Sequence, residues 1–234
     1  MPLHLHTQKH LQQIGGGASF VTQFSDNFSG AGKFMGDNWA ILGCDASVLN
    51  MVDVDTNINL TAGQLVLGGA VAALGNLRLI MVPFPAIDAR VVKAQSLVRG
   101  VFAQATFISR ATGAGGYYAG VMAYNTAPDD GKCYYFGVDQ AGQADFTRNI
   151  DATETNLATN IFAAAGNDVF RIEVVPSSTG NLVTGKRNGT TVFTTNDTNA
   201  GRPAFTGGWY GMFFRYQIDG GANSIWDNFS GGLI

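Results

Sequence analysis

Short apolar runs recur along the chain from residue 20 onward, and glycine, asparagine, aspartate or proline bounds each of them. In the segment FRIEVV at 170–175, alternate side chains fall on one face of an extended strand, because strand side chains alternate with a period of two. Hairpin turns are predicted at Asp130-Gly131, Asn188-Gly189 and Gly207-Gly208. Strands are predicted at 20–28, 39–43, 47–53, 64–68, 77–83, 97–109, 116–124, 133–139, 143–148, 168–175, 181–187, 190–195, 209–217 and 223–229.

Helical periodicity is weak throughout the chain. The best helical candidate is DATETNLATNIFAAA at 151–165, which we interpret as one or two helical turns or as a loop that crosses between sheets. With 31 glycines and many short strands, the pattern predicts an all-β fold, a two-sheet antiparallel jelly-roll sandwich. A length of 234 residues fits one such domain.

The first 19 residues differ from this body. They contain all three histidines of the chain, several glutamines and a Gly15-Gly16-Gly17 hinge. We predict an extended N-terminal arm at 1–19 attached to a body at 20–234. The candidate interaction residues of the arm are His4, His6, His10, Gln12 and Gln13.

A metal site on the arm is the alternative. His4 and His6 alternate on an extended strand, so both imidazoles would meet one ion if several chains converged on an axis. Two ligands per chain are too few for a closed site, and hydrogen bonds to a neighbouring subunit are the favoured interpretation. No cofactor is predicted.

The pentapeptide DNFSG occurs twice, at 26–30 and 227–231, close to the two ends of the body. Nothing around it recurs, so a repeated domain is not indicated. We predict instead that the two segments are neighbours in one sheet. Each phenylalanine, Phe28 and Phe229, then points into the core, and each Asp-Asn satisfies backbone groups at a strand end.

The order of these elements resembles the concanavalin A-like lectin/glucanase superfamily, and within it the laminin G-like jelly rolls, over roughly residues 20–234. The resemblance is carried by the opening D-x-F followed by Trp39, the YYAGV segment at 117–121, YYFGV at 134–138, FRIEV with its hairpin, GWYGM at 208–212 and the closing D-N-F. It implies two curved antiparallel sheets. It does not imply one function, because lectins, hydrolases, adhesion modules and virion proteins share this fold.

Composition excludes some classes of function. Only 13% of the residues are charged and the net charge is −3 without a basic cluster, which excludes nucleic-acid binding. No stretch of about 20 apolar residues predicts a membrane span. The N-terminus lacks the pattern of a secretory signal, so we expect synthesis in a cytoplasm. Cys44 and Cys133 are interpreted as two buried thiols, with one disulfide as the alternative.

Catalytic patterns are missing, and we predict that the chain is not an enzyme. Glycosidases of this fold resemble E-x-D-x-x-E on one strand, where two carboxylates face one cleft. The chain has only two glutamates, Glu154 and Glu173, and Val175 stands where a second carboxylate would share the face of Glu173. The histidines all lie on the arm, where a general base is poorly held.

Aromatic and acidic residues supply candidates for a sugar site, since sugar C–H surfaces stack on rings. Core packing is the default for any single aromatic, because about half of strand side chains point inward. Asp129-Asp130 beside Gly131 offers oxygen ligands for calcium, but an exposed turn is favoured. The candidate glycan-binding residues are Tyr117, Tyr118, Asp129, Asp130, Trp209 and Tyr210.

The leading hypothesis is a virion component of a tailed bacteriophage, either a capsid decoration protein or a tail or baseplate protein. Phage proteins resemble this arrangement of an anchoring arm and a displayed sandwich, and a weakly charged surface suits packed subunits. The expected partners are other virion proteins, further copies of the chain and host glycans. A carbohydrate-binding module is the second hypothesis, and a glycoside hydrolase is the third.

Overall fold

A computed structural model describes residues 23–29, 32–33, 39–42, 58–61, 63–67, 77–83, 100–110, 117–125, 132–150, 153–203, 209–216 and 224–234. Every regular element in these ranges is a β-strand. Within them, no helix is long and apolar enough to cross a bilayer. The predicted strand at 47–53 and the arm at 1–19 lie outside the described residues.

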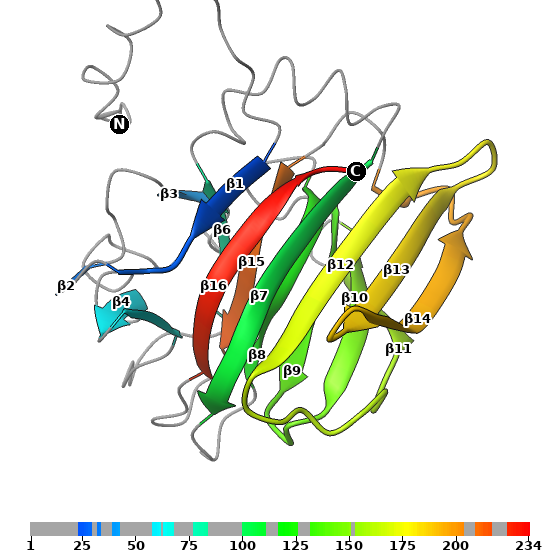
Figure 1. The fold of residues 1–234 in the computed structure, drawn as a ribbon. Coiled ribbons are helices and arrows are strands. Elements are labelled where there is room, and N and C mark those ends of the chain that lie inside the picture. The colour runs from blue at the N-terminus through cyan, green and yellow to red at the C-terminus, as the bar shows by residue number, and fades with distance from the viewer. Residues whose placement is uncertain are drawn as a thin grey trace, which may run out of the picture.

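The larger sheet contains nine strands in the order β14-β13-β12-β7-β16-β5-β4-β2, with β1 also paired to β16. Figure 1 shows β16 and β7 side by side at its centre. The strands of the larger sheet are β1 (Gln23–Asp26), β2 (Gly32–Lys33), β4 (Ile58–Thr61), β5 (Gln64–Leu67), β7 (Val101–Arg110), β12 (Asp168–Pro176), β13 (Asn181–Arg187), β14 (Thr190–Asp197) and β16 (Ser224–Leu233).

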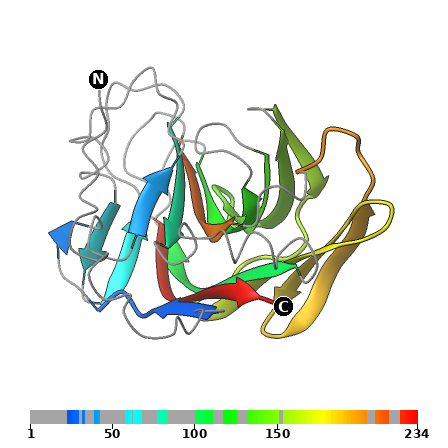
Figure 2. The same ribbon diagram turned by 90° about the horizontal axis from the view of Figure 1, so that it is seen from above.

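The smaller sheet contains seven strands in the order β11-β10-β9-β8-β15-β6-β3. Figure 2 shows the two sheets as stacked layers. All the strand pairs in both sheets are antiparallel, which confirms the predicted two-sheet sandwich. The strands of the smaller sheet are β3 (Trp39–Leu42), β6 (Leu77–Pro83), β8 (Tyr117–Asn125), β9 (Cys133–Asp139), β10 (Ala144–Ile150), β11 (Thr153–Ala158) and β15 (Trp209–Tyr216).

The sequence predicts a helix or crossing loop at 151–165. This prediction is wrong at Thr153–Ala158, which form β11, an edge strand paired with β10. The pairing decides the conformation, because Thr147 Oγ1 donates a hydrogen bond to Asn156 Oδ1 at 2.9 Å across the two strands. A threonine-rich segment also suits a strand better than a helix. By contrast, the Asn188-Gly189 hairpin is confirmed, since both residues have positive φ between β13 and β14.

Aromatic rings fill the space between the sheets. Trp226 of β16 lies 5.3 Å from Phe107 of β7 and 5.5 Å from Phe170 of β12, measured between ring centroids, and both contacts are edge-to-face. Phe136 of β9 reaches Phe170 from the smaller sheet at 5.0 Å. Burial of such a ring stabilises the fold by roughly 1.5–3 kcal/mol. These contacts hold the two sheets together.

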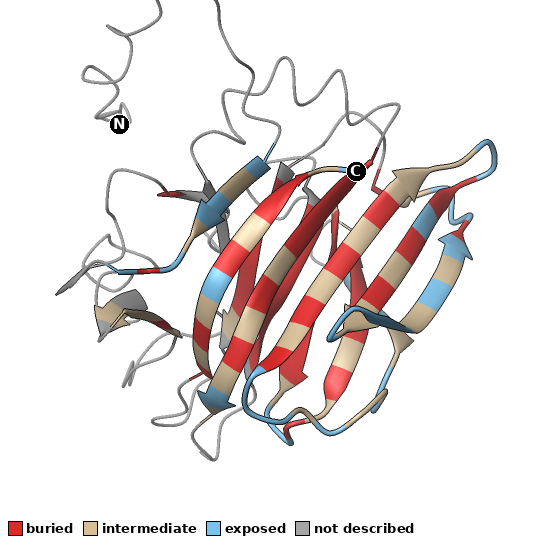
Figure 3. Ribbon diagram, in the orientation of Figure 1, coloured by how far each residue is buried: buried red, intermediate tan, exposed pale blue. Residues whose placement is uncertain are grey.

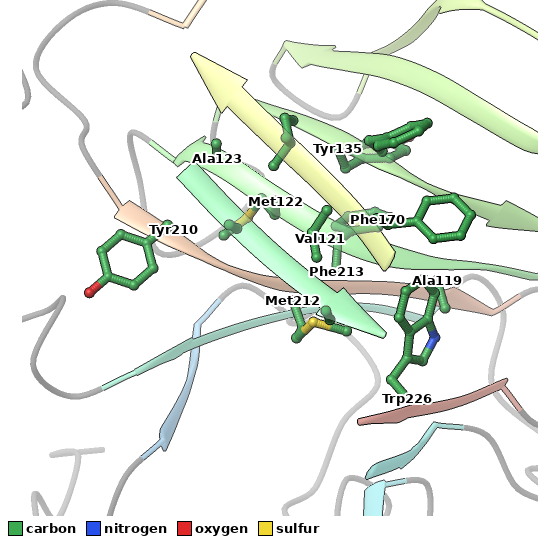
Figure 4. Close-up of a cluster of buried hydrophobic side chains, with 14 of the residues drawn as sticks. Ala119, Val121, Met122, Ala123, Tyr135, Phe170, Tyr210, Met212, Phe213 and Trp226 are labelled. Atoms are coloured by element: carbon green, nitrogen blue, oxygen red, sulfur yellow. The ribbon is translucent and has the colours of Figure 1, made fainter. Parts of the chain in front are cut away.

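The strands of the two sheets differ in how their faces are buried. Along β12 a buried residue alternates with a half-buried one, as the bands in Figure 3 show, so the outer face of the larger sheet meets solvent. In β9, residues 133–138 are all buried. Figure 4 shows the buried cluster around β8 and β15, in which Val121 and Met122, although adjacent in the chain, belong to opposite faces of the smaller sheet.

The two DNFSG segments meet in the larger sheet, as predicted. β1 pairs with β16 so that Asp26 lies opposite Phe229. Phe28 and Phe229 are both 1% exposed. The Phe28 amide donates to Asp26 Oδ1 at 2.7 Å, and the Asn228 amide donates to Asp227 Oδ1 at 2.7 Å. The ends of the body therefore close one sandwich.

Candidate functional site

Polar and aromatic side chains lie together on the outer face of the smaller sheet. On β9, Phe136 points toward the larger sheet, so Tyr135, one residue before it, and Cys133, three residues before it, point away. Strand pairing extends this face into two rows. One row is Tyr135, Thr147 and Asn156, and the next row is Cys133, Asn149 and Glu154.

This outer face is concave. Arg215 of β15 donates a hydrogen bond to Glu154 Oε2 of β11 and forms an ion pair with it. In the smaller sheet these strands are separated by β10, β9 and β8. A flat sheet would hold them about 19 Å apart, since neighbouring strands are about 4.8 Å apart. Their contact requires strong curvature, and we call this surface the concave face.

An aromatic cluster lines the concave face. The Tyr135 and Phe213 rings stack with centroids 4.1 Å apart, and Tyr118 packs edge-to-face on Tyr135 at 4.9 Å. All three side chains are buried. Burial raises the pKa of both tyrosines, and the nearby Asp145 and Glu154 charges raise them further. The hydroxyl groups therefore stay protonated at neutral pH.

The two tyrosine hydroxyls of this cluster lie near acidic residues. Tyr118 donates to the Asp145 carbonyl oxygen at 2.5 Å. The Glu154 carboxylate contributes to the raised pKa of Tyr135, after burial. Cys133 is buried on the same face, whereas Cys44 lies outside the described residues, so the predicted pair of thiols stays a prediction.

Asp145, on β10, is a second acid beside the concave face, in addition to Glu154 on β11. Its Oδ1 accepts the Asn160 amide at 2.7 Å. Burial raises the pKa of the Asp145 carboxyl, and the nearby Asp139 charge raises it further. Asp145 lies four residues from Asn149, the strand partner of Glu154, which is about 13 Å along an extended strand. The two acids therefore hold separate positions and separate partners.

The other glutamate of the chain lies on the opposite side of the sandwich. Glu173 is on the outer face of β12, where its Oε1 accepts hydrogen bonds from Arg171 Nε at 2.6 Å and Lys186 Nζ at 2.9 Å. Burial opposes ionisation, but these two cations hold the pKa of Glu173 below its usual range. No cluster of three metal-ligating side chains occurs among the described residues.

Two candidate glycan-binding tyrosines are buried, on different faces of the smaller sheet. Tyr118 belongs to the aromatic cluster of the concave face and is 8% exposed, whereas Tyr210 points between the sheets and is 1% exposed. Tyr210 packs so closely under Gly231 that a Cβ there would lie 2.2 Å from its ring. The burial of both rings agrees with the packing interpretation and does not support stacking on a sugar.

Other candidates from the sequence are not brought into the site. Tyr117 and Trp209 lie in β8 and β15, but their side chains are outside the described part of the structure. The remaining candidates also lie outside it: His4, His6, His10, Gln12, Gln13, Asp129 and Asp130.

The sequence interpretation missed the polar side chains of the concave face. Asp145, Thr147 and Asn149 alternate in ADFTRNI, and this period of two was the available signal. The Glu154–Arg215 pair had no such signal, because the two residues are 61 positions apart.

Solved structures show what this architecture is similar to. An endo-1,3-beta-glucanase from Streptomyces sioyaensis matches with a TM-score of 0.55 and 14% identity, over 92% of this chain and 99% of that one. A Bacillus licheniformis beta-glucanase matches with a TM-score of 0.51 and 10% identity, over 95% and 100%. The chain has a two-sheet jelly-roll fold similar to that of these glucanases.

A protein of unknown function from Shewanella oneidensis MR-1 shares the fold, with a TM-score of 0.51 and 13% identity over 92% of this chain and 89% of that one. No protein-family model and no curated sequence matches the chain. Identities this low establish a common fold, and the activity of this chain has to be argued from its own residues.

Proposed function

We propose that this chain is a non-hydrolytic carbohydrate-binding domain and that its concave face holds a neutral glycan. The observation that carries the proposal is the ion pair between Glu154 and Arg215 on this face. The pair carries no net charge and engages the Glu154 carboxylate, one of the two acids that hydrolysis on this face could use. Two similar structures are beta-glucanases, which supports a β-glucan as the first ligand to test.

The carboxylates of the concave face are poorly arranged for hydrolysis. Retaining glycosidases hold two carboxyl groups about 5–5.5 Å apart, and inverting ones about 6.5–9.5 Å apart. Glu154 is held by Arg215, while Asp145 is held by the Asn160 amide at 2.7 Å. A general acid and a nucleophile need to flank one bond, and these two groups are directed to different protein partners.

The same face offers groups that suit sugar hydroxyls. Asn156 is exposed beside the Thr147 hydroxyl, and the Glu154 and Arg215 side chains are 17% and 26% exposed. The Asn156 amide both donates and accepts hydrogen bonds, the Glu154 carboxylate accepts them, and the Arg215 guanidinium donates them. A concave surface with a few convergent polar groups over an apolar floor is typical of ligand sites.

Binding is tested by calorimetry of the full chain with β-1,3-glucan oligosaccharides. Asn156→Ala removes one hydrogen-bonding group and is expected to weaken binding by roughly 5–10-fold, the equivalent of about 1–1.4 kcal/mol. Arg215→Met is expected to weaken it at least as much. Arg171→Met, which removes a paired arginine from the opposite face, is the matched control and is expected to leave binding unchanged.

Turnover is tested with the same glucan by release of reducing ends. We expect none. Hydrolysis that Glu154→Gln or Asp145→Asn abolishes would contradict the proposal. Glu173→Gln is the control here, since Glu173 is ion-paired on the opposite face.

A virion role stays a prediction, because the arm at 1–19 lies outside the described residues and the similar structures do not bear on it. It predicts that a chain lacking 1–19 keeps its folded body and loses association with a phage particle. Glycan binding at the concave face is compatible with either setting.

A further inference from the structure

Four polar side chains lie buried between the sheets at one end of the sandwich. Tyr134 of β9 and Arg148 of β10 are strand partners in the smaller sheet. Asn181 of β13 and Asp197 of β14 are strand partners in the larger sheet. Their exposed fractions are 0%, 8%, 0% and 6%, respectively. We call this group the inter-sheet clasp.

Hydrogen bonds run through the clasp in one direction. Asn181 Nδ2 donates to the Tyr134 hydroxyl at 3.1 Å, and that hydroxyl donates to Asp197 Oδ2 at 2.6 Å. Arg148 Nη1 donates to Asp197 Oδ1 at 2.7 Å from the other side. The chain of donors therefore ends at one carboxylate, which the arginine neutralises.

Two polar atoms of the clasp have no partner within the described structure. They are Arg148 Nε, a donor, and Asn181 Oδ1, an acceptor, and both are buried. The Asn181 amide is not simply reversed, because Nδ2 also donates to the Pro203 carbonyl at 2.8 Å. Reversal would set an oxygen against that carbonyl oxygen. The free acceptor is therefore real.

Leaving such atoms unsatisfied is costly, at roughly 1–3 kcal/mol for a buried neutral group and more for a charged one. A single partner that serves both atoms would have to accept from Arg148 Nε and donate to Asn181 Oδ1. A hydroxyl-type oxygen does both. The partner is also neutral, because Arg148 and Asp197 already balance each other.

We propose that one internal water molecule bridges Arg148 Nε and Asn181 Oδ1. It closes a ring of five groups that runs from Arg148 through Asp197, Tyr134 and Asn181 and back. Both atoms are buried, and buried water commonly satisfies polar groups of this kind. The completed ring fixes the edge strand β14 and its neighbour β13 over β9 and β10.

A crystal structure of the full chain, at a resolution that shows ordered water, tests the proposal. We expect one water within hydrogen-bond distance of both atoms. Tyr134→Phe keeps both atoms and is expected to keep the water, whereas Asn181→Leu is expected to lose it. Should Asn181→Leu fail to fold, the wild-type and Tyr134→Phe maps still decide.

Other results would overturn the proposal. They are a direct bond of either atom to another protein group, a larger molecule in the clasp, or no density between the two atoms. In solution, NMR of the wild-type chain is expected to show a cross-peak between the Arg148 Nε proton and a long-lived water. The absence of that cross-peak from an assigned, solvent-protected proton counts equally against it.

Discussion

The two copies of DNFSG have the same sequence and the same buried phenylalanine, yet their backbones differ. In the first copy, β1 ends at Asp26 and the residue with positive φ is Phe28, at 53°. In the second copy, the chain continues through β16 and the residue with positive φ is Asn228, at 49°. The identical pentapeptide ends one strand and forms an irregularity inside another.

Their contacts explain the difference. Asp26 accepts the Phe28 amide and also the Trp39 indole Nε1 at 2.7 Å, so its carboxylate anchors the chain as it leaves the sheet. Asp227 Oδ1 accepts a hydrogen bond from the backbone amide of the next residue, Asn228. The register of β16 with β7 shifts between Asp227 and Ser230. A bulge lets Phe229 point inward within a continuous strand. The pentapeptide itself specifies that its phenylalanine ring is buried. The residues that each copy contacts specify its backbone conformation.

Removing either phenylalanine is expected to have the largest effect, because both copies contribute to one core. Phe229→Ala and Phe28→Ala are each expected to lower the free energy of unfolding by roughly 3–5 kcal/mol. The larger loss is expected for Phe229, because its ring lies closer to Trp39, at 4.8 Å against 5.9 Å for Phe28. Urea denaturation measures both losses. A loss below about 1 kcal/mol for one variant would remove the equivalence of the two rings.

Replacement of Asp26 and of Asp227 is expected to change the free energy of unfolding by clearly different amounts in the two copies. Asp26→Ala leaves the part-buried Trp39 indole and the Phe28 amide without their acceptor, so we expect a loss of about 2–3 kcal/mol. Asp227→Ala removes one exposed contact, and about 0.5 kcal/mol is expected. Equal losses in urea denaturation would show that Asp26 has no special anchoring role.

The pentapeptides also show how far the sequence could be interpreted. Their repetition predicted the pairing of β1 with β16, because closing a sandwich requires its ends to meet. Local pattern failed at Thr153–Ala158, where pairing with β10 outweighed a weak helical signal. The concave face was missed because Glu154 meets Arg215 only through sheet curvature, which periodicity does not encode.

Asn228 gives the smallest expected effect and tests the backbone difference alone. Its φ of 49° lies in the left-handed region, which asparagine and glycine tolerate better than other residues. Asn228→Gly is therefore expected to change the free energy of unfolding by less than about 0.5 kcal/mol, and Asn228→Ala to lower it by about 1 kcal/mol. The matched change in the first copy is Asn27→Ala, which removes an exposed side-chain bond to the Ser29 amide where φ is not positive. Since no left-handed residue is replaced there, a loss of about 0.5 kcal/mol or less is expected. If Asn27→Ala proved as costly as Asn228→Ala, the left-handed bulge in β16 would not be what distinguishes the second copy.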